Sequence, residues 1–153
     1  VMGRASVSGS PRSYFRKILT PGEAEHLHGI SGKVPFKMAP LPFIVEKITA
    51  LYPGFGITPK SYARIEQKTD GHNWHVDTGD MGHMPWCRLS ASIGLSRPDE
   101  YSGGEFQFYE PFEEIASHFC DAIIYTSAEV HRVLPHDGCR KVLLVFLGEK
   151  DGE

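Results

Sequence analysis

From about residue 60 onward, the chain is a succession of short apolar segments separated by turn-forming residue pairs. Pairs such as Asp70-Gly71, Gly103-Gly104 and Asp137-Gly138 bound these segments. Short runs bounded in this way are typical of β-strands joined by tight turns. Strands are predicted at residues 60–67, 74–78, 87–95, 104–109, 122–125, 131–134 and 141–147. So many short strands in one region favour an all-β sandwich or barrel.

Two helices are expected before this region, as a buttress for the sheets. Thr20, Pro21 and Glu23 have the order of a capping box with proline at the first helical position. Within residues 42–52, apolar residues recur at helical spacing and end at a Pro-Gly pair. A first strand is expected at residues 13–19.

The length and composition indicate one domain. The 153 residues are 41% hydrophobic and 23% charged, and we expect a flexible tail at residues 1–12 before a single domain at residues 13–150. The net charge of −3 argues against a nucleic-acid-binding surface, and no apolar run approaches the ~20 residues of a membrane span. The three cysteines have no metal-binding spacing, which indicates reduced thiols and a cytoplasmic location.

His75 and Asp77 are separated by one residue in a predicted strand. Residues i and i+2 of a strand point to the same face, so these side chains can offer a nitrogen and an oxygen to one ion. His131 opens a later predicted strand and could supply a third ligand. Two histidines and one carboxylate leave half of an octahedron open, as non-haem Fe(II) oxygenases require. An isolated His-x-Asp pair also occurs by chance in many proteins. The case for a metal site therefore depends on the motifs that surround this pair.

Arg140 leads into the apolar segment 141–147 and needs an anionic partner, because a buried unpaired guanidinium is expensive. One candidate partner is a carboxylate of the protein itself, such as Glu105 or Glu129. The other is the distal carboxylate of a dicarboxylic co-substrate, held by two parallel hydrogen bonds.

Taken together, four motifs in this order resemble the Fe(II)/2-oxoglutarate-dependent dioxygenases, and more narrowly their prolyl 4-hydroxylase-like branch with the PKHD-type hydroxylases. The similarity covers about residues 60–148. The motifs are His75-x-Asp77; the stretch from Leu89 to Phe106 with Tyr101-Ser102-Gly103-Gly104-Glu105; His131-Arg132-Val133-Leu134-Pro135; and Gly138-Cys139-Arg140.

The resemblance implies a mainly β fold, a double-stranded β-helix (jelly-roll) with two supporting N-terminal helices. It implies that His75, Asp77 and His131 bind Fe(II) and that Arg140 binds the C5 carboxylate of 2-oxoglutarate, with O2 as the other co-substrate. Ascorbate is a candidate additional cofactor. The implied reaction hydroxylates a C–H bond and releases succinate and CO2.

The chain departs from the family pattern around the co-substrate. A tyrosine often stands nine or ten residues before the first metal ligand, where this chain has Glu66 and Ile65. Tyr62 and Ser92 are therefore the candidates for a second contact to 2-oxoglutarate.

The expected substrate is a prolyl residue in a protein or peptide. The alternatives are hydroxylation of a free amino acid or another small molecule, which a second basic clamp in a deep pocket would favour, and a catalytically idle metal-binding jelly-roll. Residues 79–86 follow the ligand strand and are expected either to lie over the site or to form a plain surface loop. Four histidines are expected at the surface: His26, His28, His118 and His136.

Overall fold

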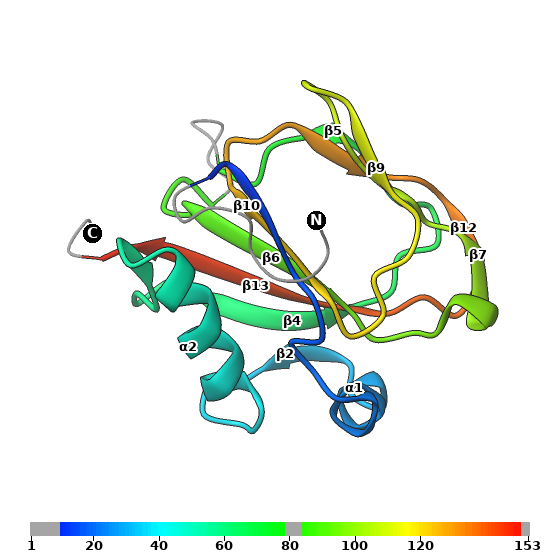
Figure 1. Ribbon diagram of the computed structural model, residues 1–153, viewed down its shortest axis with the longest axis horizontal. Coiled ribbons are helices and arrows are strands. Elements are labelled where there is room, and N and C mark those ends of the chain that lie inside the picture. Colours follow the sequence, from blue (N-terminus) through cyan, green and yellow to red (C-terminus); the bar gives the residue numbers. More distant parts are fainter. Residues whose placement is uncertain (1–9, 79–83, 151–153) are drawn as a thin grey trace.

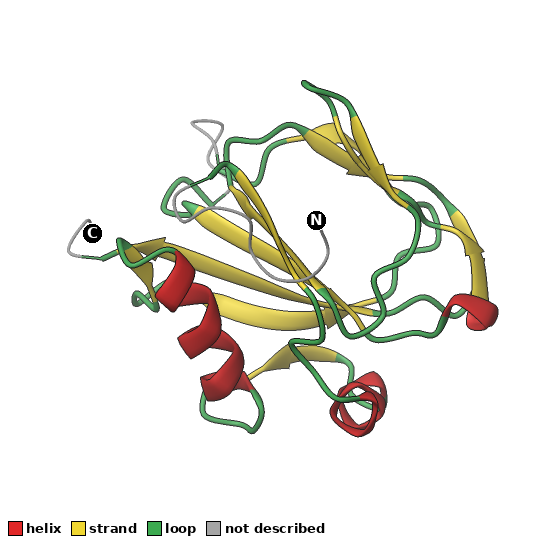
Figure 2. Ribbon diagram, in the orientation of Figure 1, coloured by secondary structure: helices red, strands yellow, loops and turns green. Residues whose placement is uncertain are grey.

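Two β-sheets face each other, and two helices cover the outer face of the larger sheet (Figures 1 and 2). This architecture is seen in the computed structural model, which describes residues 10–78 and 84–150. The strand pairs within the sheets are all antiparallel. It is the double-stranded β-helix, or jelly-roll, that the sequence predicts.

The larger sheet has seven strands and includes β13 (Val142–Glu149), which is the longest strand among the described residues. The order of this sheet is β1 (Arg12–Phe15), β10 (Ala122–Thr126), β6 (Leu89–Gly94), β13, β4 (Tyr62–Glu66) and β2 (Gly32–Val34), and β3 (Phe55–Gly56) pairs with β13. Strands β6 and β13 lie at the centre: β13 is nearly continuously apolar, and β6 alternates apolar residues with serines but is buried along its whole length.

The opposite layer consists of shorter strands. A four-stranded sheet has the order β5 (His72–His75), β11 (His131–Val133), β8 (Phe106–Phe108) and β9 (Glu113–Ile115). A two-stranded sheet of β7 (Tyr101–Gly103) and β12 (His136–Gly138) continues this layer, and the 3-10 helix η1 (Pro98–Glu100) precedes β7.

The two helices are α1 (Pro21–His28) and α2 (Leu41–Leu51). The predicted capping box is confirmed at α1: the Thr20 hydroxyl accepts a hydrogen bond from the Glu23 N–H at 3.1 Å, and the Glu23 carboxylate accepts one from the Thr20 N–H at 2.9 Å. The apolar face of α2 packs on the larger sheet through Leu41, Ile44 and Ile48.

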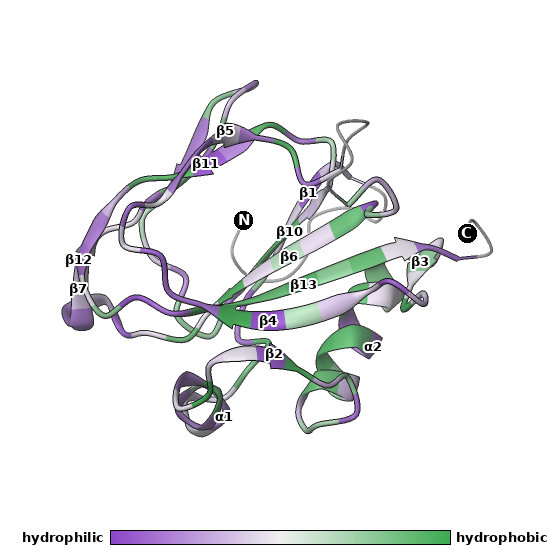
Figure 3. Ribbon diagram, turned by 180° about the vertical axis from the view of Figure 1, so that it is seen from behind, coloured by the Kyte–Doolittle hydropathy of each residue, from purple (hydrophilic) through white to green (hydrophobic). Residues whose placement is uncertain are grey.

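Strand alternation divides the larger sheet into a helix-facing side and a side that faces the smaller sheet. In β4, Ala63 and Ile65 belong to the core beneath the helices, whereas Tyr62, Arg64 and Glu66 line a pocket between the sheets. Figure 3 shows the contrast in hydropathy, with β13 and α2 largely hydrophobic and β7, β11 and β12 largely hydrophilic. A second small core fills the rest of the space between the sheets: Tyr14, Phe106, Phe108, Ile123 and Tyr125.

Some boundaries differ from the predicted ones. The strand expected at residues 74–78 is β5, which ends at His75, and the strand expected at residues 13–19 ends at Phe15. Strand β1 begins at Arg12, so it includes the last residue of the expected tail; residues 1–9 lie outside the described part of the chain. Within the described residues, no helix is long and apolar enough to cross a membrane.

Candidate metal centre and co-substrate pocket

His75 and His131 lie directly opposite each other on neighbouring strands. They are register partners in the antiparallel pair β5–β11, and their rings are 4.3 Å apart between centroids. Directly opposite residues of an antiparallel pair point to the same face. The pairing therefore brings together two histidines that are 56 positions apart in the sequence.

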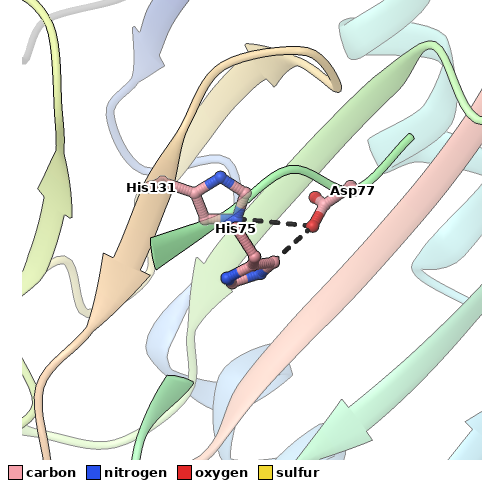
Figure 4. A group of neighbouring side chains, drawn as sticks. All are labelled: His75, Asp77 and His131. Atoms are coloured by element: carbon pink, nitrogen blue, oxygen red, sulfur yellow. Dashed lines mark ion pairs between the residues drawn. The ribbon is translucent and has the colours of Figure 1, made fainter. Parts of the chain in front are cut away.

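Asp77 follows β5 in a bend, not in the strand from which its orientation was predicted. Its N–H donates to the Ser127 carbonyl at 3.0 Å, which fixes the backbone at this point. The carboxylate oxygen Oδ1 lies 3.4 Å from Nε2 of His75 and 3.4 Å from Nε2 of His131 (Figure 4). One ligand atom from each of the three side chains lies within 4.8 Å of the others.

Each imidazole is oriented by its other nitrogen. Nδ1 of His75 is 2.6 Å from the Asn73 carbonyl oxygen, and Nδ1 of His131 is 2.8 Å from the Glu129 carbonyl oxygen. A carbonyl accepts only from a protonated nitrogen, so the neutral form of each ring carries its proton on Nδ1 and keeps the lone pair on Nε2 for a metal.

Tyr125 completes the support of the carboxylate. Its hydroxyl donates to Oδ2 of Asp77 at 3.1 Å, and its fully buried ring lies 4.7 Å from the His131 ring. Because Oδ2 is occupied by this bond, Oδ1 is the oxygen that faces both histidines. Sequence reasoning missed this role, although a tyrosine ending the apolar run Ala122-Ile123-Ile124 was a signal for it.

The electrostatics of the three side chains favour the charged carboxylate. Burial raises the pKa of Asp77, but the hydrogen bonds that His131 and His75 donate through Nε2 in their protonated form outweigh burial and hold this pKa well below its usual range. The hydrogen bond to Asp77 raises the pKa of His75. Two imidazole nitrogens and one carboxylate oxygen in this arrangement fit the donor set of non-haem Fe(II).

A pocket of about 270 Å³ extends from these three residues along the inner face of the larger sheet. Tyr62 lies opposite Phe146 at one end, and Glu66 lies opposite Val142 at the other. At the usual strand rise, these two pairs are about 13 Å apart. The Tyr62–Phe146 pair is level with Ser90 of β6, whose hydroxyl bonds to the Asp77 carboxylate, so this end lies near the three candidate ligands.

Arg140 lies at the far end, buried to 7% exposure. Within the described residues it forms no ion pair, and Glu129, one carboxylate that could have neutralised it, binds Arg12 at 2.6 Å instead. Burial lowers the pKa of Arg140, which means that the charged guanidinium is held in an unfavourable environment. A dicarboxylate entering the pocket would relieve this cost.

Gly104 makes room for Arg140. This residue has a φ of +72°, and a Cβ atom placed on it would collide with Cδ of Arg140. Only glycine combines this backbone conformation with so close an approach. The Gly103-Gly104 pair, predicted as a turn, therefore also shapes the bottom of the pocket.

The structure brings both candidates for the second co-substrate contact to the pocket but places them differently. The Ser92 hydroxyl is 3.3 Å from Nε2 of His118, whose pKa is lowered to about 3 by burial and by the charge of Arg140. Ser92 pairs with Leu144, midway along the pocket, and its hydrogen-bond partner His118 lies within reach of the Arg140 charge. The Tyr62 hydroxyl donates to Sδ of Met84 at 3.2 Å, at the end opposite Arg140.

Two predictions about histidines are wrong. His118 and His136, expected at the surface, are buried to 3% and 6% exposure, because the loop that carries His118 folds against Gly94 and His136 begins strand β12, which pairs with β7. The segment expected to lie over the site falls mainly on residues 79–83, which are outside the described residues. Of the remainder, Met84 and Trp86 both contact Tyr62 at the pocket.

Comparison with known proteins agrees with this geometry. No family model matches the chain. A PKHD-type hydroxylase of Nitrosomonas eutropha is 32% identical over 87 residues, which are 52% of this chain but only 38% of that protein. A Pseudomonas putida prolyl-4-hydroxylase superimposes with a TM-score of 0.66 at 15% identity, covering 92% of this chain and 94% of that one. A 2OG-Fe(II) oxygenase family oxidoreductase of Burkholderia pseudomallei gives 0.63 at 14% identity, covering 90% and 84%.

The chain has the fold of the 2-oxoglutarate/Fe(II) oxygenases. The predicted resemblance to the prolyl hydroxylase-like branch is confirmed by the similarity to the PKHD-type hydroxylase. In this oxygenase fold, the His-Asp-His cluster lies between the two sheets at one end of the pocket and Arg140 lies at the other.

Proposed function

We propose that this protein is an Fe(II)- and 2-oxoglutarate-dependent dioxygenase that hydroxylates a C–H bond. The observation that carries the proposal is a single pocket with a candidate metal site at one end and a candidate carboxylate-binding arginine at the other. One end has three convergent ligand atoms within 4.8 Å, and the other has a buried guanidinium that forms no ion pair within the described residues.

In this proposal His75, Asp77 and His131 hold Fe(II), and Arg140 holds the C5 carboxylate of 2-oxoglutarate. Ser92 is the better placed second contact for that carboxylate, and Tyr62 contributes near the metal. When bound, iron supplies O2 activation coupled to oxidative decarboxylation. In the overall reaction, 2-oxoglutarate, O2 and the substrate C–H bond give succinate, CO2 and an alcohol. Ascorbate remains a candidate reductant for the iron.

The surroundings of the site would restrict water and orient the reactants. Phe106 stacks on the His131 ring at 5.3 Å between centroids, and Val142, Leu144 and Phe146 line the floor beneath the co-substrate. These apolar walls strengthen the interaction of Arg140 with a carboxylate, because the local dielectric is low.

We propose a prolyl residue of a protein or peptide as the substrate. The similarity to a PKHD-type hydroxylase and the fold shared with a prolyl-4-hydroxylase support this choice. A free amino acid or another small molecule is the second candidate, which a specific observation favours: Arg64 and Lys68 also line the pocket and supply basic groups besides Arg140. The three free cysteines, two of them buried, support a cytoplasmic location.

The test is succinate formation from 2-oxoglutarate in air with Fe(II), with and without proline-rich peptides. Succinate released faster with a peptide, together with a peptide mass gain of one oxygen atom, supports prolyl hydroxylation. Slow, peptide-independent succinate supports the dioxygenase and directs the search to small molecules. The Asp77→Ala variant is the control and should form none. A wild-type protein that binds Fe(II) but forms no succinate contradicts the proposal and favours an idle jelly-roll.

A further inference from the structure

Arg64 lies at the middle of the pocket wall formed by β4. It stands between Tyr62 and Glu66 on the face of the strand that is turned away from the helices, and all three residues line the pocket. Its partner on β13 is Leu144, an apolar residue that offers no charge or hydrogen bond to the guanidinium.

The guanidinium of Arg64 is incompletely paired: its charge acts on the nearby Glu66 carboxylate, but the two groups form no ion pair within the described residues. Its Nε atom is buried without a hydrogen-bond partner, and no ion pair to Arg64 is formed within residues 10–78 and 84–150. The neighbouring carboxylate of Glu66 is already engaged, because its Oε2 lies 2.7 Å from Nε2 of His72. A buried donor left without a partner costs about 1–3 kcal/mol, more when the group is charged.

A second cation lies directly opposite Arg64 on the neighbouring strand of the same sheet. Lys33 of β2 is its direct register partner, so both side chains project from the same face. The Lys33 ammonium lies over the Tyr62 ring at 4.8 Å, which places it beside the pocket wall. Like charges opposite each other destabilise a sheet unless an anion lies between them.

The charge balance of the pocket leaves room for an anion. Its lining includes three cations, Arg64, Lys68 and Arg140, and two carboxylates, Glu66 and Asp77. The charges of Fe(II) and of 2-oxoglutarate would cancel each other, so the lining keeps one positive charge and Lys33 adds another. Arg140, at the far end, is the residue assigned to the co-substrate, which leaves Arg64 free for the substrate.

We propose that Arg64, assisted by Lys33, binds a carboxylate of the primary substrate. This inference rests on the proposed dioxygenase function and names the class of substrate: a molecule with a carboxylate near the C–H bond that is hydroxylated. Two sources carry this group, the α-carboxylate of a free amino acid and an acidic side chain next to proline in a peptide.

The experiment compares ligands that differ only in a carboxylate. Anaerobic calorimetry on protein loaded with Mn(II) and 2-oxoglutarate measures binding of L-proline against L-prolinamide, and of the capped peptide Gly-Glu-Pro-Gly against Gly-Gln-Pro-Gly. The variants are Arg64→Gln, Arg64→Lys and, as a matched control, Arg97→Gln, which removes an exposed arginine paired with Glu25. Binding of 2-oxoglutarate is measured separately for each variant and for Arg140→Ala.

In the wild type and in Arg97→Gln, we expect the carboxylate member of one pair to bind about tenfold tighter than its amide, which corresponds to about 1.4 kcal/mol. The pair that shows the difference identifies the source. Arg64→Gln should abolish the preference, Arg64→Lys should keep part of it, and 2-oxoglutarate affinity should be unchanged in both.

Three results overturn the inference. They are a wild type that prefers the carboxylate in neither pair, a preference that survives in Arg64→Gln, and a loss of 2-oxoglutarate affinity in Arg64→Gln as large as in Arg140→Ala. Failure of the dioxygenase proposal is distinct, because it appears as absent 2-oxoglutarate binding in the wild type. The ligand pairs are then titrated without Mn(II) and 2-oxoglutarate, which tests Arg64 alone.

Discussion

At the scale of single residues, each side chain of the proposed metal site is oriented by a hydrogen bond at the atom that does not face the other two side chains; the Tyr125 hydroxyl also lies 3.4 Å from Nε2 of His131. His75 and His131 use Nδ1 for backbone carbonyls, and Asp77 uses Oδ2 for the Tyr125 hydroxyl. Such contacts fix the tautomer and the orientation of a ligand before the metal arrives. The supporting residue Tyr125 is therefore as testable as the three ligands.

We expect Tyr125→Phe to weaken Mn(II) or Fe(II) binding roughly ten- to hundredfold, the usual range for loss of such a supporting contact. The variant removes the hydroxyl that donates to Oδ2 of Asp77 and leaves the packing of the ring intact, while the hydrogen bond from Ser90 to the carboxylate is retained. Anaerobic metal titration measures the effect. Tyr52→Phe is the matched control, because it also removes a buried hydroxyl with a hydrogen bond, here to the Ser10 carbonyl at 2.7 Å. Equal metal affinities of the two variants would refute the role of Tyr125.

His118 gives a pH-dependent prediction. Burial, and then the charge of Arg140, lower its pKa from 6.5 to about 3 in the folded protein, and Ser92 shares a hydrogen bond with it. Below pH 6.5 His118 binds a proton in the unfolded chain but stays neutral in the folded protein. The free energy of unfolding therefore falls with falling pH. At pH 5 this amounts to about 2 kcal/mol relative to pH 8, at about 1.4 kcal/mol per pH unit.

Denaturant unfolding between pH 5 and 8 checks the prediction about His118. The stability of a His118→Gln variant should depend less on pH than that of the wild type, whatever its stability at pH 8. If the free energy of unfolding depended on pH in the same way in both proteins, His118 would not be buried in its neutral form.

At the scale of elements, strand register explains both what the sequence predicts and what it leaves open. The His75-x-Asp77 spacing and His131 at the start of a strand were enough to propose the three ligands, although Asp77 lies beyond the end of β5. The pairing of His75 with His131, and of Lys33 with Arg64, depends on which strands become neighbours. Local patterns do not specify that choice, so the cation pair beside the pocket could not be predicted from them.

The burial of His118 was missed for a related reason. A histidine in a polar loop predicts exposure, but Gly94 lets this loop approach so closely that a Cβ at residue 94 would meet the His118 backbone. The contact is tertiary and leaves no local sequence signal beyond the glycine itself.

Gly104 lies in the connection between β7 and β8 and contacts Arg140, so the Gly104→Ala variant tests how closely Arg140 depends on this connection. The added methyl group would collide with Arg140, so we expect 2-oxoglutarate affinity to fall by about tenfold or more, or about 1.4 kcal/mol. Gly32→Ala is the control, because Gly32 has a similar φ of +78° but no atom within 4 Å of the position that an added methyl group would take. Both variants should lose about 1–2 kcal/mol of stability from backbone strain. A normal 2-oxoglutarate affinity in Gly104→Ala would show that Arg140 does not depend on this glycine.

At the scale of the whole molecule, Arg12 connects the two sheets that enclose the site. It belongs to β1 of the larger sheet, and its guanidinium lies over the Phe108 ring of the smaller sheet at 4.2 Å. It also binds the Glu129 carboxylate at 2.6 Å and the carbonyl oxygens of Pro111 and Glu110 at 2.7 and 3.0 Å. Glu129 in turn accepts, through its backbone, the hydrogen bond from His131. A chain of contacts therefore runs from the edge of one sheet to a proposed metal ligand on the other.

We expect Arg12→Ala to lower the free energy of unfolding by roughly 3 kcal/mol, since the arginine side chain is only 11% exposed and its loss leaves the Glu129 carboxylate partly buried without its partner. We also expect metal affinity to fall, because the loop that orients His131 is no longer tied to β1. Denaturant unfolding and anaerobic Mn(II) titration measure the two effects, and Arg16→Ala, at an exposed position four residues away, controls for the loss of charge. If Arg12→Ala loses stability but binds Mn(II) as tightly as Arg16→Ala does, the metal site is positioned by the β5–β11 pairing alone. In that case the contact between the sheets serves only stability.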